Sequence, residues 1–269
     1  MRSNGQVCGH RAVTLHPTAI VDPEARLGEG VTIGPYAIVG PHVTIGDRTV
    51  IGAHAVIEGH TTLGAENEIF TGAVVGSRTQ DKKFDGKVSY LVIGDRNRIR
   101  EYVTMNPGTK EGTETRIGHD NLFMAYSHVA HDCIVHNHAI LANQATLAGH
   151  VEVEDRAIIG GLSAVHQFVR IGRLSLVGGC SKVVQDIPPF MIVDGHPVRA
   201  FSINSVGLDR AGYPKEEKMK LKKAFKVLFR SGHSLKHAIA ELETFEKPFS
   251  PCLAALLDFL KRSERGICG

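Results

Sequence analysis

An apolar residue recurs at every sixth position from Val21 to Val75 and again from Ile117 to Val183, and this period restricts the possible folds more than any other feature of the chain. The phase is the same in a first block that ends at Val75 and in a second block that begins at Ile117. A period of six matches neither the 3.6-residue turn of an α-helix nor the alternation of a half-buried strand. It is typical of short strands joined by turns, as in hexapeptide-repeat parallel β-helices.

Three such units make one triangular coil, and glycine or a small residue flanks most of the apolar anchors, which suits tight corners. Because each coil buries its inner face only against its neighbours, the array is stable as a stack that needs caps at its ends. An antiparallel sandwich is the alternative, but the strict phase over so long a stretch argues against it. We therefore predict a mainly β domain, a parallel β-helix, over residues 1–200.

Two polar stretches interrupt the repeat. The first lies near residues 77–90 and is rich in charge, and the second lies near residues 106–114 and is rich in Gly, Thr and Pro. Both are predicted to be loops that leave the wall of the β-helix. Loops of this size in a compact repeat are usually functional or disordered.

Beyond Val183 the six-residue phase ends, and residues 200–212 are predicted to be a linker. Helical periodicity begins at Pro214, with further helix starts at Ser234 and Pro251, because Pro and Ser favour the first positions of a helix. We predict a small helical domain over residues 201–269. Its first helix carries a row of cations: Lys215, Lys218, Lys220, Lys222, Lys223, Lys226 and Arg230. This row is either a solvated face or a docking patch for an acidic partner, and it lacks the interleaved aromatic residues of a nucleic-acid site.

Composition restricts the cellular setting more than the chemistry. The net charge is only +3. The five cysteines are scattered and odd in number, which favours a reducing compartment such as the cytoplasm over a disulfide framework. No apolar run is long enough to span a bilayer, and residues 1–11 lack the apolar core of a signal peptide.

Histidines are concentrated in the second block of the repeat. With 18 residues to a coil, His131 lies one coil from Gly149 and two coils from Gln167. The same arithmetic predicts that four histidines gather on one edge of the prism: His128, His131, His150 and His166. A single histidine is more often a solvated turn residue, and we keep that interpretation for His119, His136 and His138. Four on one edge indicate a functional cleft.

Acyl transfer needs a base for the acceptor's proton and donors for the oxyanion that develops. The pair His131-Asp132 offers a base and a carboxylate that could orient it. Gly149, one coil away, offers a backbone N–H that no side chain obstructs.

These residues belong to stretches that resemble the UDP-N-acetylglucosamine O-acyltransferase family, which opens lipid A synthesis in Gram-negative bacteria. The matching stretches are His16-Pro17-Thr18-Ala19-Ile20-Val21, Gln80-Asp81-x-Lys83, Ile93 to Glu101, His128-Val129-Ala130-His131-Asp132-Cys133, Thr146-Leu147-Ala148-Gly149-His150, His166-Gln167-Phe168 and the tail from Arg262 to Gly266. The likeness covers almost the whole chain. The histidine-rich segments on adjacent coils are the specific part of it, since many transferases share hexapeptide repeats.

The resemblance implies a left-handed parallel β-helix with a C-terminal helical domain, a homotrimer with active sites between subunits, and no cofactor or metal. It implies that an (R)-3-hydroxyacyl chain moves from acyl carrier protein to the sugar 3-hydroxyl. His131 would be the general base, supported by Asp132, and the Gly149 N–H would hold the oxyanion. The acidic carrier protein would suit the basic first helix of the tail.

The resemblance also implies substrate contacts. Gln80, Asp81 and Lys83 would contact the glucosamine and the acyl donor. The nucleotide sugar would be lined by His128, His150, His166 and Gln167, with Asn204 and Arg210 at its uridine diphosphate end. Gly179 lies near the position that measures acyl-chain length, where glycine would leave room for a longer chain.

Departures from the family pattern leave alternatives. Residues 105–109 read Met-Asn-Pro-Gly-Thr where the family often has Ile-His-Arg-Gly-Thr, and Val206 stands where an acidic residue is common. One alternative is the same transfer to a 3-amino sugar, which gives an amide. Another is a hexapeptide zinc enzyme with His128, His131 and His150 as ligands. The related N-acyltransferase is disfavoured because its additional N-terminal domain is not seen, and a structural β-helix would need no histidine cluster.

Overall fold

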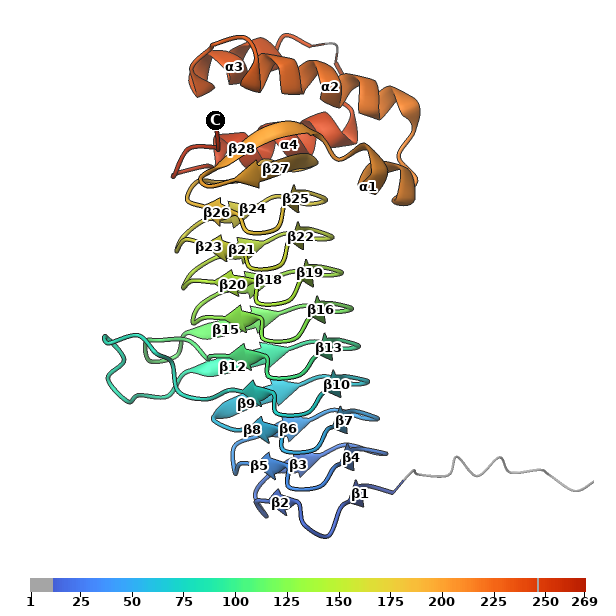
Figure 1. Cartoon of the computed structure of the whole chain (residues 1–269), viewed down its shortest axis with the longest axis vertical. Coiled ribbons are helices and arrows are strands. Elements are labelled where there is room, and N and C mark those ends of the chain that lie inside the picture. The colour runs from blue at the N-terminus through green and yellow to red at the C-terminus, as the bar shows by residue number, and fades with distance from the viewer. Residues whose placement is uncertain (1–11, 246) are drawn as a thin grey trace, which may run out of the picture.

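The computed structural model describes residues 12–245 and 247–269, and its main body is a triangular prism of stacked coils (Figure 1). Sheet A contains β1 (Thr14–Leu15), β4 (Thr32–Ile33), β7 (Val50–Ile51), β10 (Glu68–Ile69), β13 (Arg98–Ile99), β16 (Leu122–Phe123), β19 (Ile140–Leu141), β22 (Ile158–Ile159), β25 (Leu176–Val177), β27 (Met191–Gly195) and β28 (Val198–Ile203). Sheet B contains β2 (Ile20–Val21), β5 (Ile38–Val39), β8 (Val56–Ile57), β11 (Val74–Val75), β14 (Thr104–Met105), β17 (His128–Val129), β20 (Thr146–Leu147), β23 (Ala164–Val165) and β26 (Lys182–Val183). Sheet C contains β3 (Arg26–Leu27), β6 (Thr44–Ile45), β9 (His60–Leu63), β12 (Tyr90–Ile93), β15 (Glu114–Ile117), β18 (Ile134–Val135), β21 (Glu152–Val153) and β24 (Arg170–Ile171).

The six-residue period sets the register of these sheets, because three repeats make one coil. Parallel neighbours pair residues one coil apart, as Thr146 pairs with Ala164 and Leu147 with Val165. From Ile33 upward every apolar anchor is buried inside the prism, and each such side chain contributes about 1.5–3 kcal/mol. Together with the helical region above it, this confirms the fold class: a left-handed parallel β-helix followed by a small α-helical domain.

At each corner, the close approach between coils and the left-handed backbone conformation fall on different residues, and the sequence pattern shows only the first. Glycine directly after an anchor lies where neighbouring coils almost touch, and a Cβ on Gly28 would come within 2.7 Å of the Asp47 backbone nitrogen. The left-handed backbone conformation, however, falls two residues later and is held mostly by larger residues such as Asp132 (φ 57°) and His150 (φ 60°). Their strain is offset by the bonds between coils, including the His150 N–H to the His131 carbonyl at 3.0 Å.

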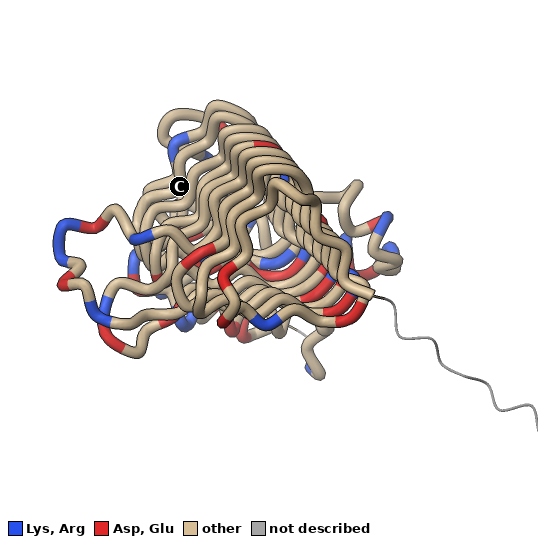
Figure 2. Tube along the Cα trace, turned by 90° about the horizontal axis from the view of Figure 1, so that it is seen from below, with Lys and Arg blue, Asp and Glu red and all other residues tan. Residues whose placement is uncertain are grey.

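Both polar insertions leave the prism at the corner that joins sheet B to sheet C, which we call edge BC. The first follows β11 and ends where β12 begins, and the second lies between β14 and β15 (Figure 1). Seen along the prism, the first insertion projects well beyond the triangular section and carries charges of both signs (Figure 2).

An antiparallel hairpin and four helices cover the C-terminal end of the prism. β27 and β28 pair as the hairpin, followed by α1 (Ser205–Arg210), α2 (Lys215–Phe229), α3 (Leu235–Leu242) and α4 (Pro251–Lys261). The predicted linker over residues 200–212 is therefore wrong: it contains the end of β28 and all of α1, and residue 200 lies inside β28. The other helix starts are confirmed, since Ser234 caps α3 and Pro251 is the first residue of α4.

Candidate active site

Edge BC stacks the predicted site residues on successive coils. His131, Gly149 and Gln167 occupy equivalent corner positions between sheets B and C, and backbone bonds join them in order. The His150 N–H donates to the His131 carbonyl, and the Phe168 N–H donates to the Gly149 carbonyl at 3.2 Å. The coil arithmetic therefore placed these residues correctly. His119, His136 and His138 lie on the other corner of sheet C.

His131 and Asp132 form a hydrogen-bonded pair. His131 Nδ1 lies 2.8 Å from Asp132 Oδ2, and both side chains are nearly buried, at 12% and 11% exposure. Burial raises the pKa of Asp132, but hydrogen bonds from His131 and Thr113 outweigh it, so the pKa lies below its usual range. An ionised Asp132 only accepts, so Nδ1 carries the proton and Nε2 presents its lone pair. The pair has the arrangement of a general base and the group that orients it.

Gly149 faces the His131 ring directly. A Cβ built on Gly149 would lie 2.5 Å from His131 Nε2 and 3.0 Å from Nδ1. Gly149 is buried, and its N–H donates to no acceptor in the part of the chain that the structure describes. A bare, unsatisfied peptide N–H beside an imidazole is the arrangement that an oxyanion donor requires.

His150 lies between His131 and an aromatic residue that sequence reasoning did not use. Its ring stacks on Phe168 with centroids 4.6 Å apart, and it meets His131 edge-on at 5.2 Å. Burial lowers the pKa of His150, although the Asp132 carboxylate opposes the shift. The signal for Phe168 was available, because it stands one coil above His150.

The other two histidines of the predicted group, His128 and His166, have hydrogen-bond partners other than His131 and Asp132. His128 lies on the outer face of β17, where its Nδ1 is 2.7 Å from Thr104 Oγ1, and burial lowers its pKa. His166 and Gln167 are exposed at the next coil above Gly149. They share edge BC with His131.

The first insertion brings one carboxylate to the His131-Asp132 pair, which we call the dyad. Asp81 Oδ2 lies 3.4 Å from His131 Nε2. Gln80 and Lys83, on either side of Asp81, have exposed side chains. This insertion therefore shares the site with edge BC, as its composition suggested.

The remaining predicted residues lie elsewhere in the single chain. Gly179 is on the corner between sheets A and B, and Arg210 is at the exposed end of α1. Asn204 is buried and caps α1: its Oδ1 accepts from the Gly207 N–H at 2.9 Å and its Nδ2 donates to the Leu174 carbonyl at 2.9 Å. Val206 is exposed on the same helix.

A metal set based on three histidines is not assembled. In the described ranges the group whose ligand atoms lie within 4.8 Å of one another is His131, Asp132 and His150, and His128 is outside it. Two imidazoles and one carboxylate could still offer ligands to a transition metal. In this arrangement, however, Asp132 already accepts the proton of His131.

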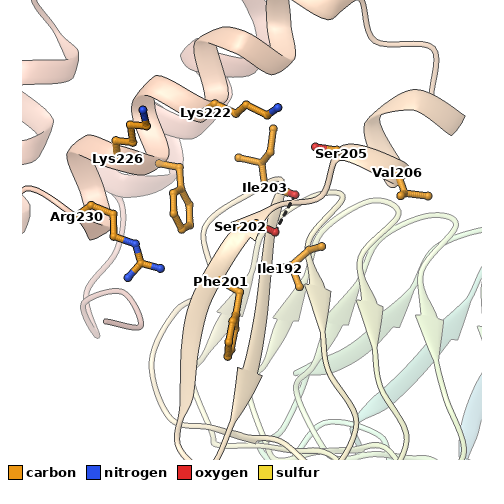
Figure 3. Close-up of a pocket in the computed structure, with 10 residues that line it drawn as sticks. Ile192, Phe201, Ser202, Ile203, Ser205, Val206, Lys222, Lys226 and Arg230 are labelled. Atoms are coloured by element: carbon orange, nitrogen blue, oxygen red, sulfur yellow. Dashed lines mark hydrogen bonds between the residues drawn. The ribbon is translucent and has the colours of Figure 1, made fainter.

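A hollow lies on the helical domain (Figure 3). It has a volume of about 470 Å³ and an apolar floor that includes Ile192, Ile203 and Phe225. Lys222, Lys226 and Arg230 of α2 rim it, with Phe201 of β28 opposite (Figure 3). Lys218, earlier on the same helix, is instead paired with Asp209.

Comparison with known proteins matches both halves of the chain. The family described as Udp N-acetylglucosamine O-acyltransferase, domain 2, matches residues 186–268, and bacterial transferase hexapeptide repeats match residues 24–59 and 114–149. An acyl-[acyl-carrier-protein]–UDP-N-acetylglucosamine O-acyltransferase of Thiobacillus denitrificans is 49% identical over 255 residues, 94% of this chain and 98% of the relative. A counterpart in Janthinobacterium is 48% identical over the same shares.

Solved structures agree with this comparison. LpxA of Acinetobacter baumannii superposes with a TM-score of 0.92 at 42% identity, covering 95% of this chain and 99% of that one. UDP-N-acetylglucosamine O-acyltransferase of Moraxella catarrhalis superposes with a TM-score of 0.90 at 40% identity and the same coverage.

Residues 12–245 and 247–269 contain no helix with the length and apolar character needed to cross a membrane.

Proposed function

The chain belongs to the acyl-[acyl-carrier-protein]–UDP-N-acetylglucosamine O-acyltransferase family and is an acyltransferase, and from this premise we propose how it works. A 3-hydroxyacyl chain passes from acyl carrier protein to the 3-position of UDP-N-acetylglucosamine. His131 is the general base, Asp132 orients it, and the Gly149 N–H receives the oxyanion. The observation that carries the proposal is that the His131 ring lies against Gly149, whose peptide N–H has no acceptor among the described residues.

The proton follows a short path. His131 Nε2 takes the proton of the sugar 3-hydroxyl as the oxygen attacks the thioester carbonyl carbon. Asp132 Oδ2, 2.8 Å from Nδ1, keeps the correct tautomer and stabilises the imidazolium that forms. A positioned base of this kind contributes roughly 10²–10⁴ in rate.

The carbonyl oxygen becomes negative in the tetrahedral intermediate and accepts the Gly149 N–H. One donor of this type is worth about 10²–10³ in kcat. When the intermediate collapses, the C–S bond breaks and the thiolate takes the proton from His131. The products are the acylated sugar nucleotide and the free thiol of the carrier protein, so all atoms balance without water or a cofactor.

The acceptor is held by the groups around the dyad. His150 and His128 both have pKa values lowered by burial, so at neutral pH they bind as uncharged rings that donate and accept hydrogen bonds. Asp81 and Gln80 approach from the first insertion, with Lys83 nearby. His166 and Gln167 line the upper part of the path along edge BC.

Three further predicted residues, Gly179, Asn204 and Arg210, would contribute to the active site of a second subunit rather than to that of their own chain. Gly179 lies on a different edge of the prism from His131, and Arg210 lies on α1. The corner of Gly179 also exposes a row of aromatic and apolar side chains: Tyr36, Tyr102, Tyr126 and Leu162. Such a row is typical of a protein–protein interface. We infer a homotrimer in which this edge meets edge BC of a neighbour, so that Gly179 limits the acyl chain while Arg210 and Asn204 hold the diphosphate end.

The donor docks on the helical domain. The row of cations on α2 is exposed at Lys222, Lys226 and Arg230, beside the apolar hollow in Figure 3. A cationic rim around an apolar floor suits an acidic carrier protein, because opposite charge steers association and apolar contact holds it.

The experiment that tests this function is product analysis. Purified protein is incubated with 3-hydroxyacyl carrier protein and either UDP-N-acetylglucosamine or its 3-amino analogue. Mass spectrometry should show an ester of the first acceptor. An amide formed only with the second would move the acceptor atom from oxygen to nitrogen, and no product with either would overturn the function.

A further inference from the structure

The second insertion already supports the dyad, since the Thr109 N–H donates to Asp132 Oδ2 at 3.2 Å, but its Asn106 has no role in the chemistry described above. It runs from Asn106 to Thr113, one coil below His131 on edge BC, and it includes the segment that departs from the family pattern. Its first four residues, 106–109, are all buried. A buried polar turn next to a catalytic dyad needs an explanation.

The side chain of Asn106 joins this insertion to the first one. Asn106 is only 4% exposed. Its Nδ2 donates to the Ser77 carbonyl at 3.0 Å and reaches the Arg78 carbonyl at 3.4 Å. Its backbone N–H donates to the Val129 carbonyl at 3.0 Å, which fixes Asn106 to the coil above. One amide therefore ties the start of the first insertion to the wall of the β-helix.

The far end of the first insertion is tied to the same turn. Ser89 Oγ donates to the Gly108 carbonyl at 2.6 Å. The Gly112 N–H donates to the Val88 carbonyl at 2.9 Å. These bonds hold residues 88–89. At the other end, the Ser77 hydroxyl donates to the Glu58 carboxylate, and Asn106 is the side chain that bonds to the carbonyls of both Ser77 and Arg78.

Asp81 lies three positions beyond Arg78, within the segment that Asn106 anchors. Its backbone N–H donates to Thr79 Oγ1 at 3.3 Å, and its Oδ1 accepts from the Lys83 N–H at 2.8 Å. Both bonds are internal to the insertion, so they shape the turn without fixing it to the prism. Oδ2 then points at His131 Nε2, 3.4 Å away.

We propose that Asn106 is a positioning residue that holds Asp81 opposite His131 through its bonds to the Ser77 and Arg78 carbonyls. The proposal rests on the function proposed above, since it gives Asp81 a place in that reaction. Asn106 touches no substrate. It acts by keeping the first insertion in the one position from which Asp81 reaches the dyad.

A matched control separates positioning from ordinary stabilisation. Asn97 is equally buried and also donates through Nδ2, to the Gly118 carbonyl at 2.9 Å. It lies on the corner between sheets C and A, away from edge BC. Asn97→Ala therefore removes a buried amide with more bonds than Asn106, to Asn67, Gly118 and Asn121, without loosening the first insertion.

The test is a double-mutant cycle. Asn106→Ala should lower kcat/KM for the sugar nucleotide by about 10- to 100-fold, because a displacement of about 1 Å in a site can cost about 100-fold. In an Asp81→Ala background the same change should cost less than about two-fold, because its effect passes through Asp81. Asn97→Ala should lower the melting temperature and leave kcat/KM within about two-fold in both backgrounds.

Hydrogen exchange gives a second readout that needs no turnover. Asn106→Ala should speed exchange of the amides in residues 77–87, and Asn97→Ala should not. If Asn106→Ala does not fold, Asn106→Asp keeps the shape, removes the donor, and is measured in the same way. Equal losses of activity with and without Asp81, or unchanged exchange, would overturn the proposal. Wild-type protein that forms no product would instead refute the proposed function, and exchange would still decide whether Asn106 anchors the insertion.

Discussion

Substituting alanine for Gly149 adds one carbon at the point on which the mechanism depends. The new Cβ would lie 2.5 Å from His131 Nε2, whereas ordinary van der Waals contact begins at 3.4 Å, so the ring must retreat by about 1 Å. Gly149 does not have a positive φ, so its backbone accepts alanine. The ring contact is therefore the cost.

A retreat of this size separates the base from the acceptor hydroxyl. We expect kcat to fall by about 100-fold or more, which corresponds to about 2.7 kcal/mol in the barrier. The assay is steady-state turnover of the acyl carrier protein donor, with circular dichroism to confirm the fold. The matched control is Gly40→Ala on the same edge, where the nearest atom to a Cβ is the Glu58 Cα at 3.5 Å. A Gly149→Ala enzyme within two-fold of wild type, or an equal loss in Gly40→Ala, would refute the reasoning.

Three further predictions concern the surroundings of the dyad. Phe168→Ala should raise the pKa of His150 toward its ordinary value, because burial lowers it now, and an NMR titration that shows no rise would contradict the role given to the stack. Neutralising Lys220, Lys222, Lys223 and Lys226 together should raise the KM for acyl carrier protein and flatten its salt dependence, and an unchanged KM would make the row a merely solvated face. Gly179→Met should shorten the preferred acyl chain in a competition between donors, and an unchanged preference would remove Gly179 from chain measurement.

The prism and its site follow from the sequence because a period of six converts directly into position. Once a coil is 18 residues, His131 and Gly149 must be neighbours, and no tertiary information is needed. The same arithmetic placed His150 on this edge. It also applies to Phe168, which stands in a matching stretch but was given no role, because an aromatic side chain at a turn suggests no acid–base or ligand chemistry.

Other features depend on contacts that periodicity cannot show. The hairpin of β27 and β28 was not predicted, and the end of β28 fell in the predicted linker, because the antiparallel pairing breaks the six-residue phase. Met219 of α2 fits an apolar helical stripe, yet it is 49% exposed because α2 packs on one side only. Asn204 was assigned to the nucleotide from a family pattern, and in the fold its amide caps α1. The helix-capping task of Asn204 could not be recognised from its position in the sequence alone.

Asn106 illustrates a further limit. Nothing in the sequence distinguishes an asparagine that crosses between two insertions from one that turns a loop. The bonds to the Ser77 and Arg78 carbonyls appear only when both insertions are folded on edge BC.

Turnover of His131→Ala tests the central claim most directly. The variant removes the ring that faces Gly149 without adding bulk, so the β-helix should remain folded by circular dichroism. The account predicts a loss of about 10²–10⁴ in kcat with acyl carrier protein and UDP-N-acetylglucosamine as substrates. A folded His131→Ala protein that turns over at a near-normal rate would contradict it.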